Sequence, residues 1–236
     1  MMQSVKDVNN AIQKAPPQNC AKMVYWLADK IKGCTCVQQR AWYLRKFIYH
    51  ERMLKMIHLE TDRLILRNYQ LKDINDFHEL MSQEFVARHQ SFVAPLSLER
   101  CEQSVTRRLD NDSYLVCELK ENGKVIGTLE QNKEDSGNYT IGYEFSEQYG
   151  KKGYATESVK ALISHLFLAL DARRITADMD EGNVNSWRLV EKLGFRREAH
   201  FIECETSFNE KDEHGNPVLV NCFVYALLKK EWQQIV

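Results

Sequence analysis

Apolar residues recur along the chain at two spacings, and the change from one spacing to the other divides the chain into segments. Short segments that alternate apolar and polar positions, as at 61–69, or that form an apolar run, as at 218–228, predict strands. We expect strands over 61–69, 114–119, 125–131, 139–145, 174–177, 201–206 and 218–228. Apolar residues three and four positions apart predict helices, which we expect over 19–55 with a break at Gly33, and over 72–82, 97–109, 155–170 and 183–193. The order of these segments predicts an α/β layer in which helices cover both faces of one sheet.

Three of the predicted strands follow one another closely, which indicates an antiparallel meander. The dipeptide Asn122-Gly123 between the first two is typical of a tight hairpin turn. Ser136-Gly137-Asn138 joins the second strand to the third. The strongest predicted helix follows, with one apolar face made of Ala155, Val159, Leu162, Ile163, Leu166, Phe167 and Leu170.

The composition is typical of a globular protein without a membrane span. Of the 236 residues, 44% are hydrophobic and 28% are charged, and no stretch approaches the roughly 20 apolar residues that a membrane helix needs. The first ten residues are polar and lack the apolar segment of a secretory signal. The seven cysteines are odd in number and scattered, so we expect reduced thiols in a cytoplasmic protein.

Charge is distributed unevenly along the chain. Residues 1–55 hold ten Lys and Arg against three Asp and Glu, a net charge of +7. Residues 56–236 hold 22 Lys and Arg against 30 Asp and Glu, a net charge of −8. The change predicts a boundary near Met56, with 1–55 a basic helical extension of unknown role and 56–236 the main domain. Alternatively, the extension is not part of the functional protein, since Met53 and Met56 are both candidate starts.

The segment 150–156, GKKGYAT, lies between the predicted strand 139–145 and the strongest predicted helix. Glycine lets the backbone approach a ligand, and a helix N-terminus offers unpaired N–H donors and a partial positive charge. Lys151 and Lys152 add charge, and the small Ala155 leaves room. The segment predicts a phosphate site, or else an ordinary turn. Neither the G-x-G-x-x-G nor the G-x-x-x-x-G-K-[ST] nucleotide motif occurs at its expected place.

A second motif follows the turn. GKKGYATESVKAL at 150–162 and NVNSWRLVEKLGFRREAHF at 183–201 together closely resemble the GCN5-related N-acetyltransferase (GNAT) family, and within it the RimJ/RimL-like branch. ETDRLILR at 60–67 and YALLKKEW at 225–232 also look like the first and last strands of that branch. The resemblance covers about Met56 to Trp232 and does not extend to residues 1–55.

The resemblance implies the fold and the cosubstrate. The fold would be a central, mixed but mostly antiparallel twisted sheet of about seven strands flanked by helices, with residues 1–55 as an N-terminal helical extension. The N–H groups of 151–156 would hold the pyrophosphate of acetyl-CoA, and a splayed strand edge at 143–145 would pair with the pantetheine arm. Gly153 and Ala155 match the family turn, whereas Gly150 stands where Arg or Gln is usual. The residues expected to bind acetyl-CoA are Tyr143, Phe145, Gly150, Lys151, Lys152, Gly153, Tyr154, Ala155, Thr156 and Asn183.

The resemblance also suggests catalytic residues. The tyrosine that the family often has in the second motif is absent, because Leu189-Val190 stands there. Ser186 is then the candidate proton donor to the leaving thiolate, although Asn183 and Ser186 also fit a simple helix cap. Glu144 and Glu130 are the candidate bases, unless they face solvent or the solvent itself takes the proton.

The sequence leaves the acceptor open among a protein N-terminal α-amine, a small amine or antibiotic, and an aminoacyl-tRNA amine. The net charge of −8 on residues 56–236 favours cationic acceptors and disfavours bare RNA. The basic segment 1–55 is interpreted either as a contact with RNA or the ribosome or as a packing or homodimerising appendage. A non-catalytic acyl-CoA-binding sensor is the alternative function. No metal is expected, because Cys20, Cys34 and Cys36 are too sparse for a zinc site.

Overall fold

The computed structural model describes residues 20–89, 93, 95–109 and 111–235, so the first ten residues and the expected helix start at Asn19 lie outside the described part. The chain divides into two compact units, Met1–Met56 and Ile57–Val236. The described part of the first unit consists of helices α2 (Cys20–Gly33) and α3 (Val37–Lys55), and Gly33 ends α2 as predicted.

Aromatic and aliphatic side chains hold these two helices together. Leu27 of α2 is fully buried, and the rings of Trp26 and Tyr43 meet edge to face with their centres 6.0 Å apart. On α3, Val37 and Leu44 belong to the apolar spacing that predicted the helix, yet they are 82% and 41% accessible to solvent. The spacing therefore identified the helix correctly but not which side of it is buried.

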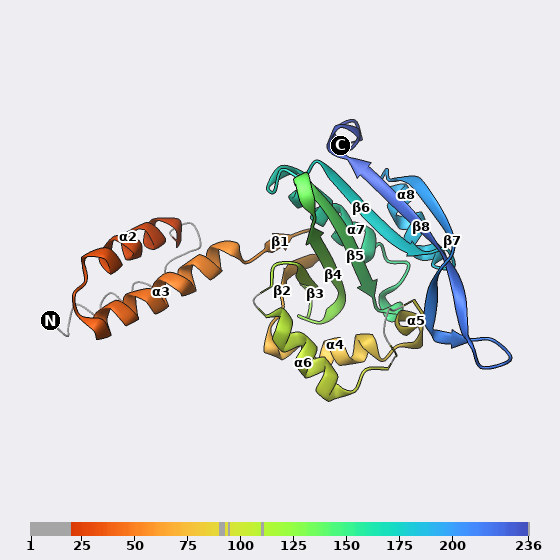
Figure 1. Cartoon of the computed structure of the whole chain (residues 1–236), viewed down its shortest axis with the longest axis horizontal. Helices are drawn as coiled ribbons and strands as arrows, with labels where there is room; N and C mark the ends of the chain where they lie inside the picture. The colour runs from red at the N-terminus through yellow and green to blue at the C-terminus, as the bar shows by residue number, and fades with distance from the viewer. Residues whose placement is uncertain (1–19, 90–92, 94, 110, 236) are drawn as a thin grey trace. The chain divides into compact units, whose positions relative to one another are not determined.

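The second unit contains one eight-stranded sheet with the order β1-β2-β3-β4-β5-β6-β8-β7 (Figure 1). Neighbouring strands are antiparallel except β5 and β6, which are parallel. The predicted mixed, mostly antiparallel sheet is thus confirmed. The strands are β1 (His58–Glu60), β2 (Leu64–Asn68), β3 (Tyr114–Leu119), β4 (Val125–Lys133), β5 (Asn138–Phe145), β6 (Arg174–Asp180), β7 (Arg196–Lys211) and β8 (Pro217–Leu228).

Two strands differ from the sequence prediction. The expected strand 61–69 is β2, shortened to Leu64–Asn68, and β1 is an additional strand before it whose three residues are too few to produce an alternation. β7 has 16 residues instead of six, because nearly all of its side chains are exposed and carry no alternating pattern. The first of these differences accounts for eight strands in place of about seven.

Helices cover both faces of the sheet, and alternate residues of β3 belong to different cores. Leu115, Cys117 and Leu119 pack beneath α7, whereas Val116 packs beneath α4 and α6. The helices are α4 (Ile74–Met81), α5 (Glu84–Ala87), α6 (Leu98–Arg108), α7 (Tyr154–Leu168), α8 (Val184–Lys192) and α9 (Lys229–Trp232), with short 3₁₀ turns at Leu71–Asp73, Asp135–Gly137 and Glu147–Tyr149.

The predicted face of α7 is buried from Val159 to Phe167, whereas Leu170 lies beyond the end of the helix and is 41% exposed. None of the described helices is both long and apolar enough to cross a membrane.

Candidate active site

Strands β5 and β6 separate soon after they begin to pair. Their parallel ladder covers only 138–140 and 174–176, although β5 continues to Phe145 and β6 to Asp180. The facing edges are therefore splayed, and their backbone groups need partners from elsewhere. A cavity of about 420 Å³ occupies this gap and extends to Ala155 in the first turn of α7 and to the start of α8.

The turn before α7 has an unusual set of free donors. Gly153 is the N-cap, with φ at +83°, a left-handed conformation that glycine adopts without strain, and Lys151 also has a positive φ of 59°. None of the six backbone N–H groups from Lys151 to Thr156 has a hydrogen-bond acceptor among the described residues. The first such bond in the helix runs from the N–H of Glu157 to the carbonyl of Gly153, at 3.0 Å. Such a donor set suits an anion.

Gly150 departs from the family pattern, and the local backbone gives a reason. Its N–H donates to the carbonyl of Glu147 at 2.8 Å, closing a 3₁₀ turn. A Cβ atom at this position would lie only 2.9 Å from that carbonyl oxygen. A residue with a side chain would therefore require the turn to shift, whereas glycine keeps the backbone donors that follow it.

A salt bridge from Arg63, the residue before β2, fixes the turn. The Arg63 guanidinium donates to the Lys152 carbonyl at 2.9 Å and to the Glu157 carboxylate at 2.7 Å, and it lies 4.3 Å from the centre of the Tyr154 ring. Burial alone would raise the pKa of Glu157, but hydrogen bonds from Thr61 and Arg63 outweigh it and lower that pKa. Glu157 is thus a paired anion in the first turn of α7.

The start of α8 uses side chains instead. Asn183 is the N-cap, and its side-chain oxygen Oδ1 accepts from the Ser186 N–H at 3.2 Å. The Ser186 hydroxyl donates to the Tyr143 hydroxyl at 2.9 Å, and the Tyr143 hydroxyl donates to the Ser186 carbonyl at 3.0 Å. Burial raises the pKa of Tyr143 to about 12, so its hydroxyl is protonated at neutral pH. Sequence reasoning assigned Tyr143 only a backbone role.

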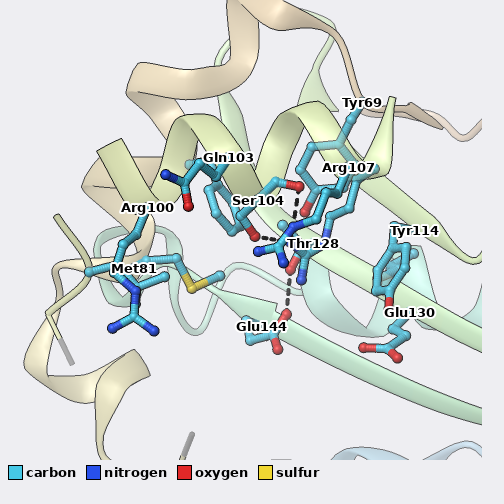
Figure 2. Close-up of a pocket in the computed structure, with 14 residues that line it drawn as sticks. Tyr69, Met81, Arg100, Gln103, Ser104, Arg107, Tyr114, Thr128, Glu130 and Glu144 are labelled. Atoms are coloured by element: carbon cyan, nitrogen blue, oxygen red, sulfur yellow. Dashed lines mark hydrogen bonds between the residues drawn. The ribbon is translucent and has the colours of Figure 1, made fainter. Parts of the chain in front are cut away.

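Glu144 and Glu130 lie on the opposite face of the sheet from Tyr143, against α4 and α6. Figure 2 shows both carboxylates at a second cavity, of about 190 Å³, and Glu144 lines the larger cavity as well. The Thr128 hydroxyl donates to Glu144, and the Asn132 side chain donates to Glu130 at 2.6 Å. Of the two predicted bases, Glu144 is therefore the one common to both cavities.

One pair at the larger cavity was missed by sequence reasoning. His89 Nδ1 lies 2.9 Å from Asp180 Oδ2, and both side chains are largely buried. A histidine held by a carboxylate is a common general base. The two residues are 91 positions apart, so no sequence spacing could have revealed the pair. In the described part of the chain, no group of three or more His, Cys, Asp or Glu side chains could hold a metal ion.

Known proteins of similar sequence and structure are N-acetyltransferases. YnaD of Bacillus subtilis strain 168, an uncharacterised N-acetyltransferase, is 28% identical over 75% of this chain and 99% of its own length. YokL, a prophage-derived uncharacterised N-acetyltransferase of the same strain, is 30% identical over 58% of this chain and 78% of its own length. A crystal structure of a GNAT-family acetyltransferase from Bacillus anthracis matches with a TM-score of 0.65 and 27% identity, covering 74% of this chain and all of that one.

The model of the acetyltransferase (GNAT) domain matches residues 63–196, more than half of the chain. Acetyl-CoA is the general acetyl donor of that family. The chain therefore belongs to the GNAT family, and it is an N-acetyltransferase.

Proposed function

We propose that this enzyme transfers the acetyl group of acetyl-CoA directly to a primary amine, without a covalent enzyme intermediate. The observation that carries the proposal is the meeting of two features at one cavity of about 420 Å³. One is the unpaired edge of β5, and the other is the first turn of α7 with its free N–H groups. Together they match the two ends of a coenzyme A arm, an amide chain and a pyrophosphate.

The cosubstrate would lie along this path. The N–H groups from Lys151 to Thr156 would bind the pyrophosphate, with Lys152 adding positive charge. The edge of β5 at Tyr143 and Phe145 would pair with the pantetheine amides, and Asn183 lines the same cavity near the thioester end. The motifs at 150–162 and 183–201 support the RimJ/RimL-like branch of the family.

The chemistry needs three proton transfers. Glu144 would take a proton from the ammonium form of the acceptor, leaving a neutral amine that attacks the thioester carbon. The new C–N bond forms as the C–S bond breaks, and the nitrogen loses its second proton to solvent. The Tyr143 and Ser186 hydroxyls, linked at 2.9 Å, would supply a proton to the departing thiolate. Glu130 lies two residue pairs further along the β4–β5 ladder and would contribute charge.

The test is release of free thiol from acetyl-CoA by the purified full chain, with peptides of varied N-termini, aminoglycosides, polyamines and amino acids as acceptors. Release that requires one class of amine, above a blank without acceptor, supports the proposal and identifies that class. Acetyl-CoA binding measured by calorimetry, with no release from any amine, would contradict it and favour an acyl-CoA-binding sensor.

A further inference from the structure

The smaller cavity lies between α6 and the sheet face that carries Glu144 (Figure 2). Its volume of about 190 Å³ is well below the roughly 300–1,000 Å³ of sites for drug-sized ligands. It therefore suits a small group. Because Glu144 lines both cavities, a group bound here would lie directly beside the gap between β5 and β6.

Helix α6 contributes three arginines to this cavity, Arg100, Arg107 and Arg108. Residues seven and eight positions after Arg100 lie on the same face of a helix as it does. None of the three forms an ion pair with any residue that the structure describes. The wall opposite Glu144 is thus positively charged.

Arg108 is the half-buried member of this group. Its guanidinium donates to the Ser104 carbonyl at 3.2 Å and also to the Ser104 hydroxyl. It lies 4.6 Å from the centre of the Tyr114 ring and 5.7 Å from that of Phe77. Aromatic faces stabilise a cation, but they leave its charge without a counterion.

Arg67, which is more deeply buried than Arg108, gives the comparison. Arg67 is paired with Asp73 at 2.8 Å and with Glu118. Burying a charge costs free energy unless it is paired, and here the fold supplies two carboxylates. Among the described residues Arg108 receives none, so its position favours an anion that comes from outside the chain.

We propose that the smaller cavity binds an anionic group of the acceptor, so that the acceptor is a primary amine with a carboxylate close to it. Glu144 would hold the amine, and the α6 arginines would hold the carboxylate through paired N–H donors. This assignment rests on the proposed acetyl transfer. The net charge of residues 56–236 favours cationic acceptors, but polyamines and aminoglycosides would bring more positive charge toward Arg100, Arg107 and Arg108. Free amino acids and peptides with an acidic first residue share the required chemistry.

The experiment compares acceptors that differ only in this charge. L-Alanine is paired with L-alaninamide, and the peptide amide Asp-Ala-Ala with Asn-Ala-Ala, while spermidine serves as the cationic acceptor. We expect kcat/KM to be about 10-fold or more higher for a carboxylate than for its amide, as for one charge-assisted hydrogen bond. A difference within the alanine pair would identify a free amino acid as the acceptor. A difference within the peptide pair would identify an acidic protein N-terminus. Equal rates within both pairs, or a faster reaction of spermidine, would overturn the proposal.

Variants test the arginines themselves. Arg108→Gln should abolish the preference for the carboxylate while leaving the Kd for acetyl-CoA unchanged. Should that variant fail to fold, the double change Arg100→Gln and Arg107→Gln, at exposed positions, should reduce the preference several-fold. Lys160→Gln, an exposed charge removed from α7, is the matched control and should leave the preference intact. A preference that survives both arginine variants would contradict the assignment.

A direct binding measurement separates this inference from acetyl transfer. L-Alanine and Asp-Ala-Ala amide are titrated calorimetrically into the protein in the presence of coenzyme A, which cannot transfer an acetyl group. Tighter binding of one of them than of its carboxamide counterpart, lost in Arg108→Gln or in the double variant, supports the cavity even if no amine releases thiol. Equal binding of both members of each pair would reject it, whatever the kinetics show.

Discussion

Helices α7 and α8 both begin at the wall of the larger cavity, but their first turns are built differently. α7 follows a glycine cap that offers no side chain, and its N–H groups from Lys151 to Thr156 have no acceptor in the described part of the chain. α8 follows Asn183, whose side chain caps it, and the Ser186 hydroxyl is bound to that of Tyr143. The start of α7 therefore offers backbone N–H groups to the cavity, whereas the start of α8 offers side chains.

This difference predicts which substitutions the starts of α7 and α8 each tolerate. A backbone site depends on the course of the chain, so deleting nearby side chains should affect it little and adding a negative charge should affect it strongly. A side-chain site should respond in the opposite way. The predictions below test this distinction, from the largest expected effect to the smallest.

Thr156→Asp in the first turn of α7 should separate binding from stability. The new carboxylate and a phosphate of coenzyme A, about 6 Å apart at an effective dielectric constant of about 20, would repel by roughly 3 kcal/mol. This repulsion would weaken the binding of coenzyme A about 100-fold. The same carboxylate at a helix N-terminus should leave stability unchanged or raise it. Calorimetry and urea denaturation measure the two effects. Thr156→Asn is the uncharged control, and equal losses in both variants would mean that the shape of the turn matters rather than its charge.

Ser186→Ala and Tyr143→Phe should each lower kcat about 10-fold, because either change interrupts proton supply to the thiolate. The two hydroxyls act as one unit, so the double variant should be no slower than the slower single variant. Steady-state kinetics with acetyl-CoA and the identified acceptor measure this effect. Multiplicative losses would show that the two hydroxyls act independently, and unchanged turnover in both would remove them from the mechanism.

Asn183→Ala should cost about 1 kcal/mol of unfolding free energy, the usual value of a lost N-cap, while Asn183→Asp should keep the cap. Urea denaturation provides the measurement. The Kd for coenzyme A should change little if Asn183 acts mainly as a cap. A loss of affinity larger than the loss of stability would instead indicate direct contact with the coenzyme.

Lys151→Ala and Lys152→Ala should each weaken coenzyme A binding only about 3-fold, as expected for exposed charges. The loss should shrink at high ionic strength because salt screens such charges. Titrations at two salt concentrations check this. A salt-independent loss of 30-fold or more would mean that side chains, and not backbone donors, hold the pyrophosphate.

Acidification should weaken the start of α7 through Glu157. Its pKa is lower in the folded protein than the ordinary value of 4.5, so its contribution to stability is complete above that value and is lost as the pH falls through the folded-state pKa. Arg63→Gln should reduce this pH dependence, since it removes a donor that lowers the pKa. Urea denaturation between pH 6 and pH 3 measures it, and identical curves for both proteins would contradict the assignment.

The parts of the fold that repeat a short pattern could be predicted from the sequence. The strand 114–119 was predicted with its observed bounds, since its apolar run ends just before an Asn-Gly turn. The start of α7 could be read from GKKGYAT because the turn is contiguous. β7 could not be predicted in full, because a strand with nearly all side chains exposed has no hydrophobic period.

Contacts between distant segments could not be read from the sequence. His89 and Asp180 meet only because the segment after α5 lies beside the end of β6. The three arginines of α6 look like an ordinary solvated helix face until the sheet places Glu144 opposite them. For Tyr143, the alternation gave the correct strand but not the partner of its hydroxyl.

The pairing of β4 with β5 makes the number of residues between the 3₁₀ turn at 135–137 and Tyr143 part of the active site. The register runs unbroken from Lys133 opposite Tyr139 to Gly127 opposite Phe145. A Cβ atom on Gly127 would lie 2.4 Å from the Phe145 ring, so a larger residue at position 127 would force Phe145 to move. Tyr143 and Glu144 are neighbours that serve opposite faces of the sheet. Inserting or deleting one residue between the 3₁₀ turn at 135–137 and Tyr143 would exchange their faces, so evolution can vary the residues of this stretch more freely than their number.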